Sequence, residues 1–208
     1  MTGLANPLRQ GLVEDRSPEP CTVVIFGASG DLTKRKLVPA LFSLFTERLL
    51  PPSFAVVGYA RKAMTDQEFK DELYEWCGKF ARHRPTPEQW ARFSECIYYQ
   101  PGDYEDPAAY AALKARLAKV DAERGIPGNR IFYLSTPPAT FPIAVQRLAE
   151  GGLTNKSEDD AFTRVIIEKP FGTDLASARA LNAHCLHHLR EDQIYRIDHY
   201  LGKETVQN

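Results

Sequence analysis

The chain lacks the features that mark secreted, membrane-spanning or nucleic-acid-binding proteins. Its four cysteines, at positions 21, 77, 96 and 185, form no CxxC pair, so we expect free thiols and no metal site. Residues 1–20 contain no long apolar run, and the mean hydropathy is -0.37, so neither a signal peptide nor a membrane partner is expected. The 26 Lys and Arg residues balance 27 Asp and Glu residues, which argues against nucleic acid as a partner. A cytoplasmic location follows.

The composition that remains is that of an ordinary globular protein. Hydrophobic residues make up 43% and charged residues 25% of the 208 positions, enough for one sizeable core. We interpret residues 1–20 as a flexible lead-in and residues 21–208 as one domain. The chain ends at Asn208 without a Gly, Pro or polar tail, which we interpret as a cut within a longer protein.

Apolar, β-branched runs alternate with helical patterns along the chain. The predicted strands are 22–26, 54–59, 96–99, 131–135, 164–167 and 194–197. The predicted helices are 32–50, 65–82, 88–94, 106–123, 141–150 and 174–190. This alternation predicts an α/β fold, a Rossmann-like, doubly wound, mainly parallel sheet with helices on both faces. In such sheets the ligand site lies beyond the carboxyl ends of the strands.

A glycine-containing loop follows the first strand. Gly27 and Gly30 lie three residues apart in the sequence GASGDLTK, ahead of a predicted helix whose N-terminal N–H groups favour phosphate. The motif GxxGDL departs from the usual GxGxxG dinucleotide fingerprint. An ordinary strand-to-helix turn is the alternative.

The second strand ends without the carboxylate that usually binds the ribose 2′-hydroxyl of NAD. Arg61 and Lys62 follow it, and the planar guanidinium group of Arg61 suits a 2′-phosphate. We therefore predict a preference for NADP over NAD, with a solvated surface arginine as the alternative.

The later strands also end in polar groups. The fourth strand is followed by Ser135-Thr136-Pro137-Pro138, which predicts a rigid, non-helical turn that could form one wall of a nucleotide pocket. Lys169 either binds a phosphate or substrate oxygen, or forms an ion pair with Glu168. The run from Asp198 to Lys203 suits acid–base chemistry, an anion site or a capped helix start.

The i, i+4 pair of His184 and His188 has no further ligand nearby, so we predict a solvated helix face and no metal.

These motifs together resemble the glucose-6-phosphate dehydrogenase family. The resemblance covers residues 20–208 and is carried by GASGDL at 27–32, YAR at 59–61, EKPFG at 168–172 and DQIYRIDHYLGKE at 192–204. It implies the oxidation of glucose 6-phosphate at C1, with hydride transfer to NADP and formation of 6-phosphoglucono-δ-lactone, the first step of the oxidative pentose phosphate pathway. Domain 21–208 would then be the NADP-binding domain, ending where the substrate-binding region starts.

The resemblance also implies roles for individual residues. The cofactor-binding set would be Gly27, Ala28, Ser29, Gly30, Asp31, Leu32, Thr33, Lys34, Lys36, Arg61, Asp103, Tyr104, Phe141 and Lys169. The substrate-binding set would be Lys169, His199, Tyr200, Leu201, Gly202 and Lys203. Lys169 and Asp198 would serve catalysis, with Asp198 orienting a histidine general base.

By the family pattern that histidine lies in a second, β+α domain beyond this chain, which also provides the usual homo-oligomer interface. We therefore predict that the 208-residue chain alone binds NADP at best weakly and turns over little or nothing. Two other functions remain open: a sugar oxidoreductase of the glucose–fructose oxidoreductase type, and a nucleotide-binding module without chemistry.

Overall fold

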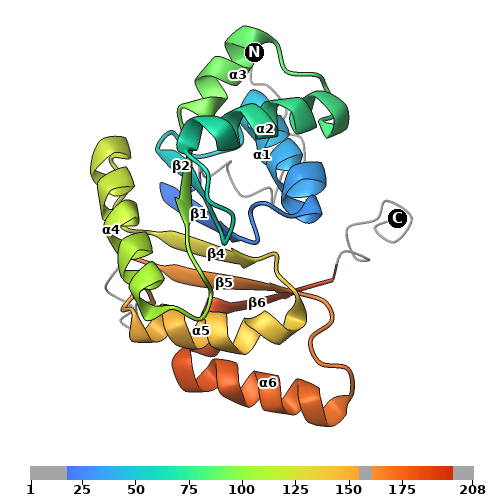
Figure 1. The fold of residues 1–208 in the computed structure, drawn as a ribbon, viewed down its shortest axis with the longest axis vertical. Helices are drawn as coiled ribbons and strands as arrows, with labels where there is room; N and C mark the ends of the chain where they lie inside the picture. The colour runs from blue at the N-terminus through green and yellow to red at the C-terminus, as the bar shows by residue number, and fades with distance from the viewer. Residues whose placement is uncertain (1–17, 155–160, 199–208) are drawn as a thin grey trace, which may run out of the picture.

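A computed structural model describes residues 18–154 and 161–198. A six-stranded sheet forms its centre, in the order β3-β2-β1-β4-β5-β6, and every neighbouring pair is parallel (Figure 1). The strands are β1 (Cys21–Phe26), β2 (Phe54–Ala60), β3 (Ile97–Pro101), β4 (Arg130–Leu134), β5 (Thr163–Glu168) and β6 (Ile194–Ile197). The predicted α/β, doubly wound fold is confirmed.

Helices connect consecutive strands. They are α1 (Val38–Thr46), α2 (Asp66–Phe80), α3 (Pro87–Ser94), α4 (Pro107–Arg124), α5 (Phe141–Glu150) and α6 (Leu175–His188), with short turns of 3-10 helix at Pro138–Thr140 and Glu191–Gln193. Within the described ranges, none of these helices is long and apolar enough to cross a membrane.

Two apolar clusters hold the helices to opposite faces of the sheet. One cluster joins α4, α5 and α6 to the sheet through residues such as Leu113, Val145 and Cys185. The other joins α1, α2 and α3 through residues such as Phe42 and Phe69. β2 lies between both clusters and is buried at all seven positions, which explains its continuous apolar sequence. All four cysteines are free and buried, as their spacing predicted.

Local capping signals in the sequence fix most helix starts. Thr65 accepts a hydrogen bond from the Glu68 amide while Glu68 reaches back to the Thr65 amide, which forms a capping box at the start of α2. Asp106 caps α4 through the Ala108 amide, and Gly125 ends that helix in the left-handed region. These caps confirm the helix starts predicted at residues 65 and 106.

The predicted helix 32–50 differs from the observed one in two ways. A π-helical segment, Thr33–Leu37, precedes α1 and widens the turn ahead of Pro39, whose missing N–H would otherwise break the helix. α1 then ends at Thr46 because Arg48 adopts a φ of 59° and the Leu49 amide donates to the Leu44 carbonyl at 2.9 Å. This closing turn was not evident in the sequence, because glycine usually occupies the position of Arg48.

The half of the sheet formed by β4, β5 and β6 is packed less completely than β2. Along β5, buried residues alternate with partly exposed ones, so one face contacts the α4–α6 cluster and the other carries side chains such as Ile166. On that second face, the Arg164 guanidinium group lies 4.1 Å from the Phe162 ring centroid and 5.9 Å from that of Tyr195.

A polar contact at the amino edge of the sheet ties α4 to the strands. Asp121 forms an ion pair with Arg130 at the start of β4, with a bond of 2.8 Å between Nη1 and Oδ1, and the two side chains are only 15% and 11% exposed. Thr22 of β1 also donates to Asp121 at 3.5 Å. Removing the carboxylate would leave a largely buried guanidinium group without its partner.

We expect Asp121→Ala to lower the free energy of unfolding by about 3 kcal/mol, because it leaves Arg130 buried and unpaired. Glu123→Ala in the same helical turn is the matched control. Its ion pair with Lys119 spans 3.8 Å between side chains that are 43% and 65% exposed, so we expect a loss below about 0.5 kcal/mol. Urea denaturation measures both values, and equal losses would contradict this account.

Candidate functional site

The order of the strands places a topological switch point between β1 and β4. The chain proceeds outward from β1 to β2 and β3, then crosses through α4 to β4 and continues outward on the other side. The connections leaving β1 and β4 therefore separate at this point, as in sheets that bind a ligand in the crevice between them.

Backbone contacts shape the glycine loop after β1. Gly27 has a φ of 80°, and a Cβ atom there would lie 2.2 Å from the Ser135 carbonyl oxygen, so only glycine fits. The Gly27 amide donates to the Tyr59 carbonyl at 3.0 Å, and the Gly30 amide donates to the Gly27 carbonyl at 2.8 Å. The loop leads directly into the helical segment, whose first N–H groups have no acceptor within the helix.

The cations that follow this loop point in different directions. The Lys34 ammonium group is 2.6 Å from Oε1 of Glu72 in α2, and its side chain is only 12% exposed. Lys62 also approaches Glu72, at 3.6 Å from Oε2. Lys36 is exposed, and within the described part of the chain no ion pair joins it. The Lys34–Glu72 pair could not be predicted from the sequence, because the two residues belong to different helical segments.

An aromatic support lies under the ends of β2 and β3. Tyr59 is fully buried and donates to the Asp103 carbonyl at 3.0 Å, which fixes the turn after β3. Burial raises the pKa of Tyr104, an effect opposed by a hydrogen bond with the Gly27 backbone and by the charge of Arg61. The exposed Arg61 guanidinium group lies 5.9 Å from the Tyr104 ring centroid. Tyr104 thus links the glycine loop to Arg61.

Ser135 and Thr136, which follow β4, lie beside this loop. The Ser135 amide donates to the Phe26 carbonyl at 3.0 Å, which places Ser135 and Thr136 beside Gly27. Among the described residues, Ser135 Oγ and Thr136 Oγ1 are buried without a hydrogen-bond partner. Buried polar atoms normally have a partner, so these two are suited to a polar ligand at the switch point.

Lys169 and Asp198 are brought together at the ends of β5 and β6. Their side chains form an ion pair of 2.6 Å and are 56% and 31% exposed. The neighbouring Glu168 instead accepts a hydrogen bond of 2.5 Å from the Tyr133 hydroxyl group. Burial raises the pKa of Tyr133, and the bond to Glu168 adds to that effect. The alternative of a Lys169–Glu168 ion pair is wrong.

Other predicted site residues are placed differently. Phe141 has no exposed surface and packs in the α4–α6 cluster, and its place beside the cofactor stays a prediction. His199, Tyr200, Leu201, Gly202 and Lys203 lie outside the described residues. Within the described ranges no cluster of potential metal ligands occurs, and His184 bonds to the Pro142 carbonyl at 2.9 Å.

These features fit a dinucleotide. The space beside Gly27, which a Cβ atom would fill, lies at the switch point. The residues that carry the two unpartnered hydroxyl groups lie there as well, and a pyrophosphate binds at this point in folds of this kind. Fold and site together define the class of dinucleotide-binding domains.

A family model confirms and narrows this class. The model described as "Glucose-6-phosphate dehydrogenase, NAD binding domain" matches residues 24–208, so the chain belongs to the glucose-6-phosphate dehydrogenase family. It forms the NAD(P)-binding part of that family's proteins.

Curated relatives agree with this assignment. The chain is 44% identical over 206 residues to glucose-6-phosphate 1-dehydrogenase 2 of Mycobacterium bovis, covering 98% of the chain and 40% of the relative. It is 41% identical over 210 residues to glucose-6-phosphate 1-dehydrogenase of Chlamydia pneumoniae, covering 100% of the chain and 41% of the relative. The chain therefore spans about 40% of the length of the curated relatives that it matches.

A solved structure shows the same arrangement. The chain is similar to a glucose-6-phosphate dehydrogenase in complex with glucose 6-phosphate, with a TM-score of 0.77 and 35% identity over 91% of the chain and 38% of that structure. The predicted fold and family are both confirmed.

We expect Gly27→Ala to lower the free energy of unfolding by roughly 2–4 kcal/mol, because the added Cβ atom collides with the Ser135 backbone and a positive φ disfavours alanine. Gly30→Ala is the matched control, since its Cβ atom would lie 3.1 Å from the Gly27 carbonyl oxygen and needs only a small shift. Thermal and urea denaturation compare the two. A Gly27→Ala protein as stable as the parent would contradict the proposed close approach.

Proposed function

We propose that this chain is the NADP-binding part of a glucose-6-phosphate 1-dehydrogenase, which oxidises glucose 6-phosphate at C1 to 6-phosphoglucono-δ-lactone. Residues 21–208 are the proposed cofactor-binding domain. The observation that carries the choice of NADP is Arg61, which follows β2 in place of the usual carboxylate and is exposed beside Tyr104. The family assignment supports the reaction.

In this proposal the glycine loop holds the pyrophosphate through its backbone. Residues Gly27 to Lys34 supply N–H groups and the start of a helix, and the Ser135 and Thr136 hydroxyl groups gain partners on the opposite side. Arg61 binds the 2′-phosphate as a planar fork, while Lys36 adds positive charge nearby. Asp103 and Tyr104 border the adenosine. The Lys34 ammonium group would contribute only by exchanging its bond with Glu72.

The ends of β5 and β6 serve the sugar in the same proposal. NADP, when bound, accepts the hydride that leaves C1. The Lys169 cation lies between the cofactor and the sugar and polarises a substrate oxygen, while Asp198 holds Lys169 at 2.6 Å and orients the general base. We propose that the 6-phosphate is bound by His199, Tyr200 and Lys203. Leu201 and Gly202 belong to the same proposed substrate-binding set. The complex of the similar solved structure with glucose 6-phosphate supports this substrate.

The complete reaction is proposed for a longer protein. The chain covers about 40% of its curated relatives, and by the family pattern the histidine base and the homo-oligomer interface belong to a segment after residue 208. We place that longer protein in the cytoplasm.

We expect Arg61→Ala to raise the Kd of NADP at least about threefold, equivalent to roughly 0.7 kcal/mol, and to leave the Kd of NAD unchanged, because only NADP carries the 2′-phosphate. Isothermal titration calorimetry of the 208-residue chain measures both. Lys62→Ala is the control, since Lys62 is the adjacent exposed cation but is paired with Glu72. An equal rise in the Kd values of NADP and NAD would contradict the proposal that Arg61 binds the 2′-phosphate.

We expect the 208-residue chain to form little or no NADPH from glucose 6-phosphate, measured by absorbance at 340 nm, because the general base is missing from it. A longer chain that includes the family's second domain is the positive control, and it should prefer glucose 6-phosphate over glucose. Robust lactone formation by the 208-residue chain would refute this division of the active site.

A further inference from the structure

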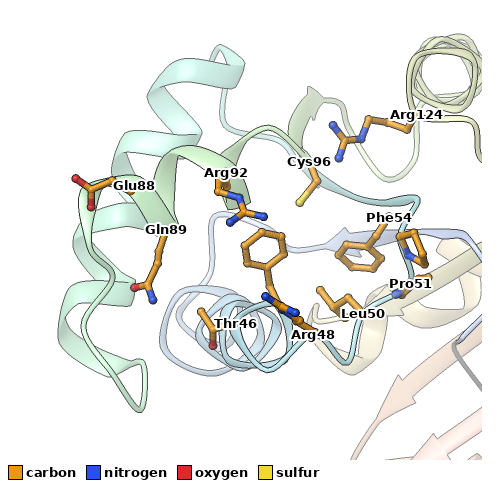
Figure 2. Close-up of a pocket in the computed structure, with 12 residues that line it drawn as sticks. Thr46, Arg48, Leu50, Pro51, Phe54, Glu88, Gln89, Arg92, Cys96 and Arg124 are labelled. Carbon is orange, nitrogen blue, oxygen red and sulfur yellow. The ribbon is translucent and has the colours of Figure 1, made fainter. Parts of the chain in front are cut away.

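A cavity lies at the opposite edge of the sheet from the proposed cofactor site. It has a volume of about 560 Å³, within the range typical of small-molecule sites, and it lies between the end of α1, α3 and the end of α4 (Figure 2). Phe54, which begins β2, forms part of its floor, whereas Arg61 follows the other end of that strand. The seven residues of β2 separate the two sites by roughly 20 Å.

The cavity combines an apolar floor with converging arginines. Phe45, Pro51 and Phe54 line the floor. Figure 2 shows Arg48 and Arg92 reaching toward the middle of the cavity from different elements, with Arg124 at its far side. Glu88 is the one carboxylate among the lining residues, so three arginines and one glutamate give the lining a net charge of +2.

Two of these arginines are available to bind a ligand. Within residues 18–154 and 161–198, neither Arg48 nor Arg92 has an ion-pair partner. Arg124 donates to the Glu95 carbonyl at 3.5 Å, which anchors its side chain at the rim. Guanidinium groups over an apolar floor bind phosphate oxygens through paired N–H groups while the floor accepts a flat ring.

Arg48 occupies an unfavourable backbone position. Its φ of 59° lies in the left-handed region at the end of α1, where the Arg48 amide donates to the Phe45 carbonyl at 3.1 Å. Glycine is favoured there because a Cβ atom is strained. The arginine side chain is thus present where the backbone alone would select glycine, and it points into the cavity (Figure 2).

We propose that this cavity, lined by Arg48, Arg92, Arg124, Phe45 and Phe54, binds a purine nucleotide at a site separate from the cofactor edge. The phosphates meet the three guanidinium groups and the base lies on the apolar floor. The competing explanation is that each arginine only offsets the negative end of a helix, since Arg92 and Arg124 lie in last helical turns and Arg48 follows one.

The test is a titration of the 15N-labelled 208-residue chain with ADP, followed by amide NMR spectra. Because the cofactor edge also suits ADP, the two sites are separated by position. We expect shifts at residues 45–54, 88–96 and 124–126 in addition to any near residues 27–36 and 61. Adenosine and inorganic phosphate, each lacking one half of the ligand, should bind the cavity more weakly than ADP.

Two variants and one control decide the outcome. Arg48→Gly relieves the backbone and keeps the fold, yet should raise the cavity Kd for ADP about fivefold or more, as should Arg92→Ala. Lys79→Ala removes a last-turn cation of α2 outside the cavity and should leave that Kd unchanged. Shifts confined to the cofactor edge, an unaltered Kd in Arg48→Gly, or equal effects of Lys79→Ala would each overturn the proposal. None of these results depends on whether the chain binds NADP.

Discussion

At the centre of the sheet, the backbone of Gly27 lies so close to the Ser135 carbonyl that no side chain fits between them. This contact joins the connections that leave β1 and β4, which then lead to opposite halves of the sheet. It brings the first amides of a helix and two buried hydroxyl groups to the same point. This steric condition suits the phosphate site that we propose at the switch point, because the N–H groups at the start of a helix favour anions.

The cofactor edge is held in place from below by aromatic side chains. The Phe26 and Tyr59 rings lie 4.8 Å apart, and Phe26 also stacks with Tyr104 at 6.0 Å. Through these rings, the apolar core of the sheet sets the positions of the turn after β3 and of Arg61. The loops of the site therefore rest on a packed layer, and their geometry depends on the core as much as on their own sequence.

What could be predicted from the sequence depends on how far apart the interacting residues are. Strand runs, the Thr65 cap and the turn at Gly27 depend on near neighbours, and all were predictable. The Lys34–Glu72 pair and the burial of Phe141 were not, because they depend on how separate helices pack. The Lys169–Asp198 pair falls between these cases. Both residues were identified as strand-end groups, but the preference of Lys169 for Asp198 over its neighbour Glu168 required the Tyr133 hydroxyl, from another strand, to engage Glu168.

The second face of β4–β6 has a consequence for the behaviour of the chain in solution. Tyr195, in the last strand of the described sheet, is 44% exposed, and such an edge is a template for pairing with other chains. Arg164 lies across Phe162 and Tyr195 and sets a positive charge over this aromatic surface. A charge in that position disfavours stacking on the strands, because a molecule that stacks there must remove water from the guanidinium group at a cost in free energy. We therefore expect the same side chain to oppose stacking of other molecules on this face of the sheet.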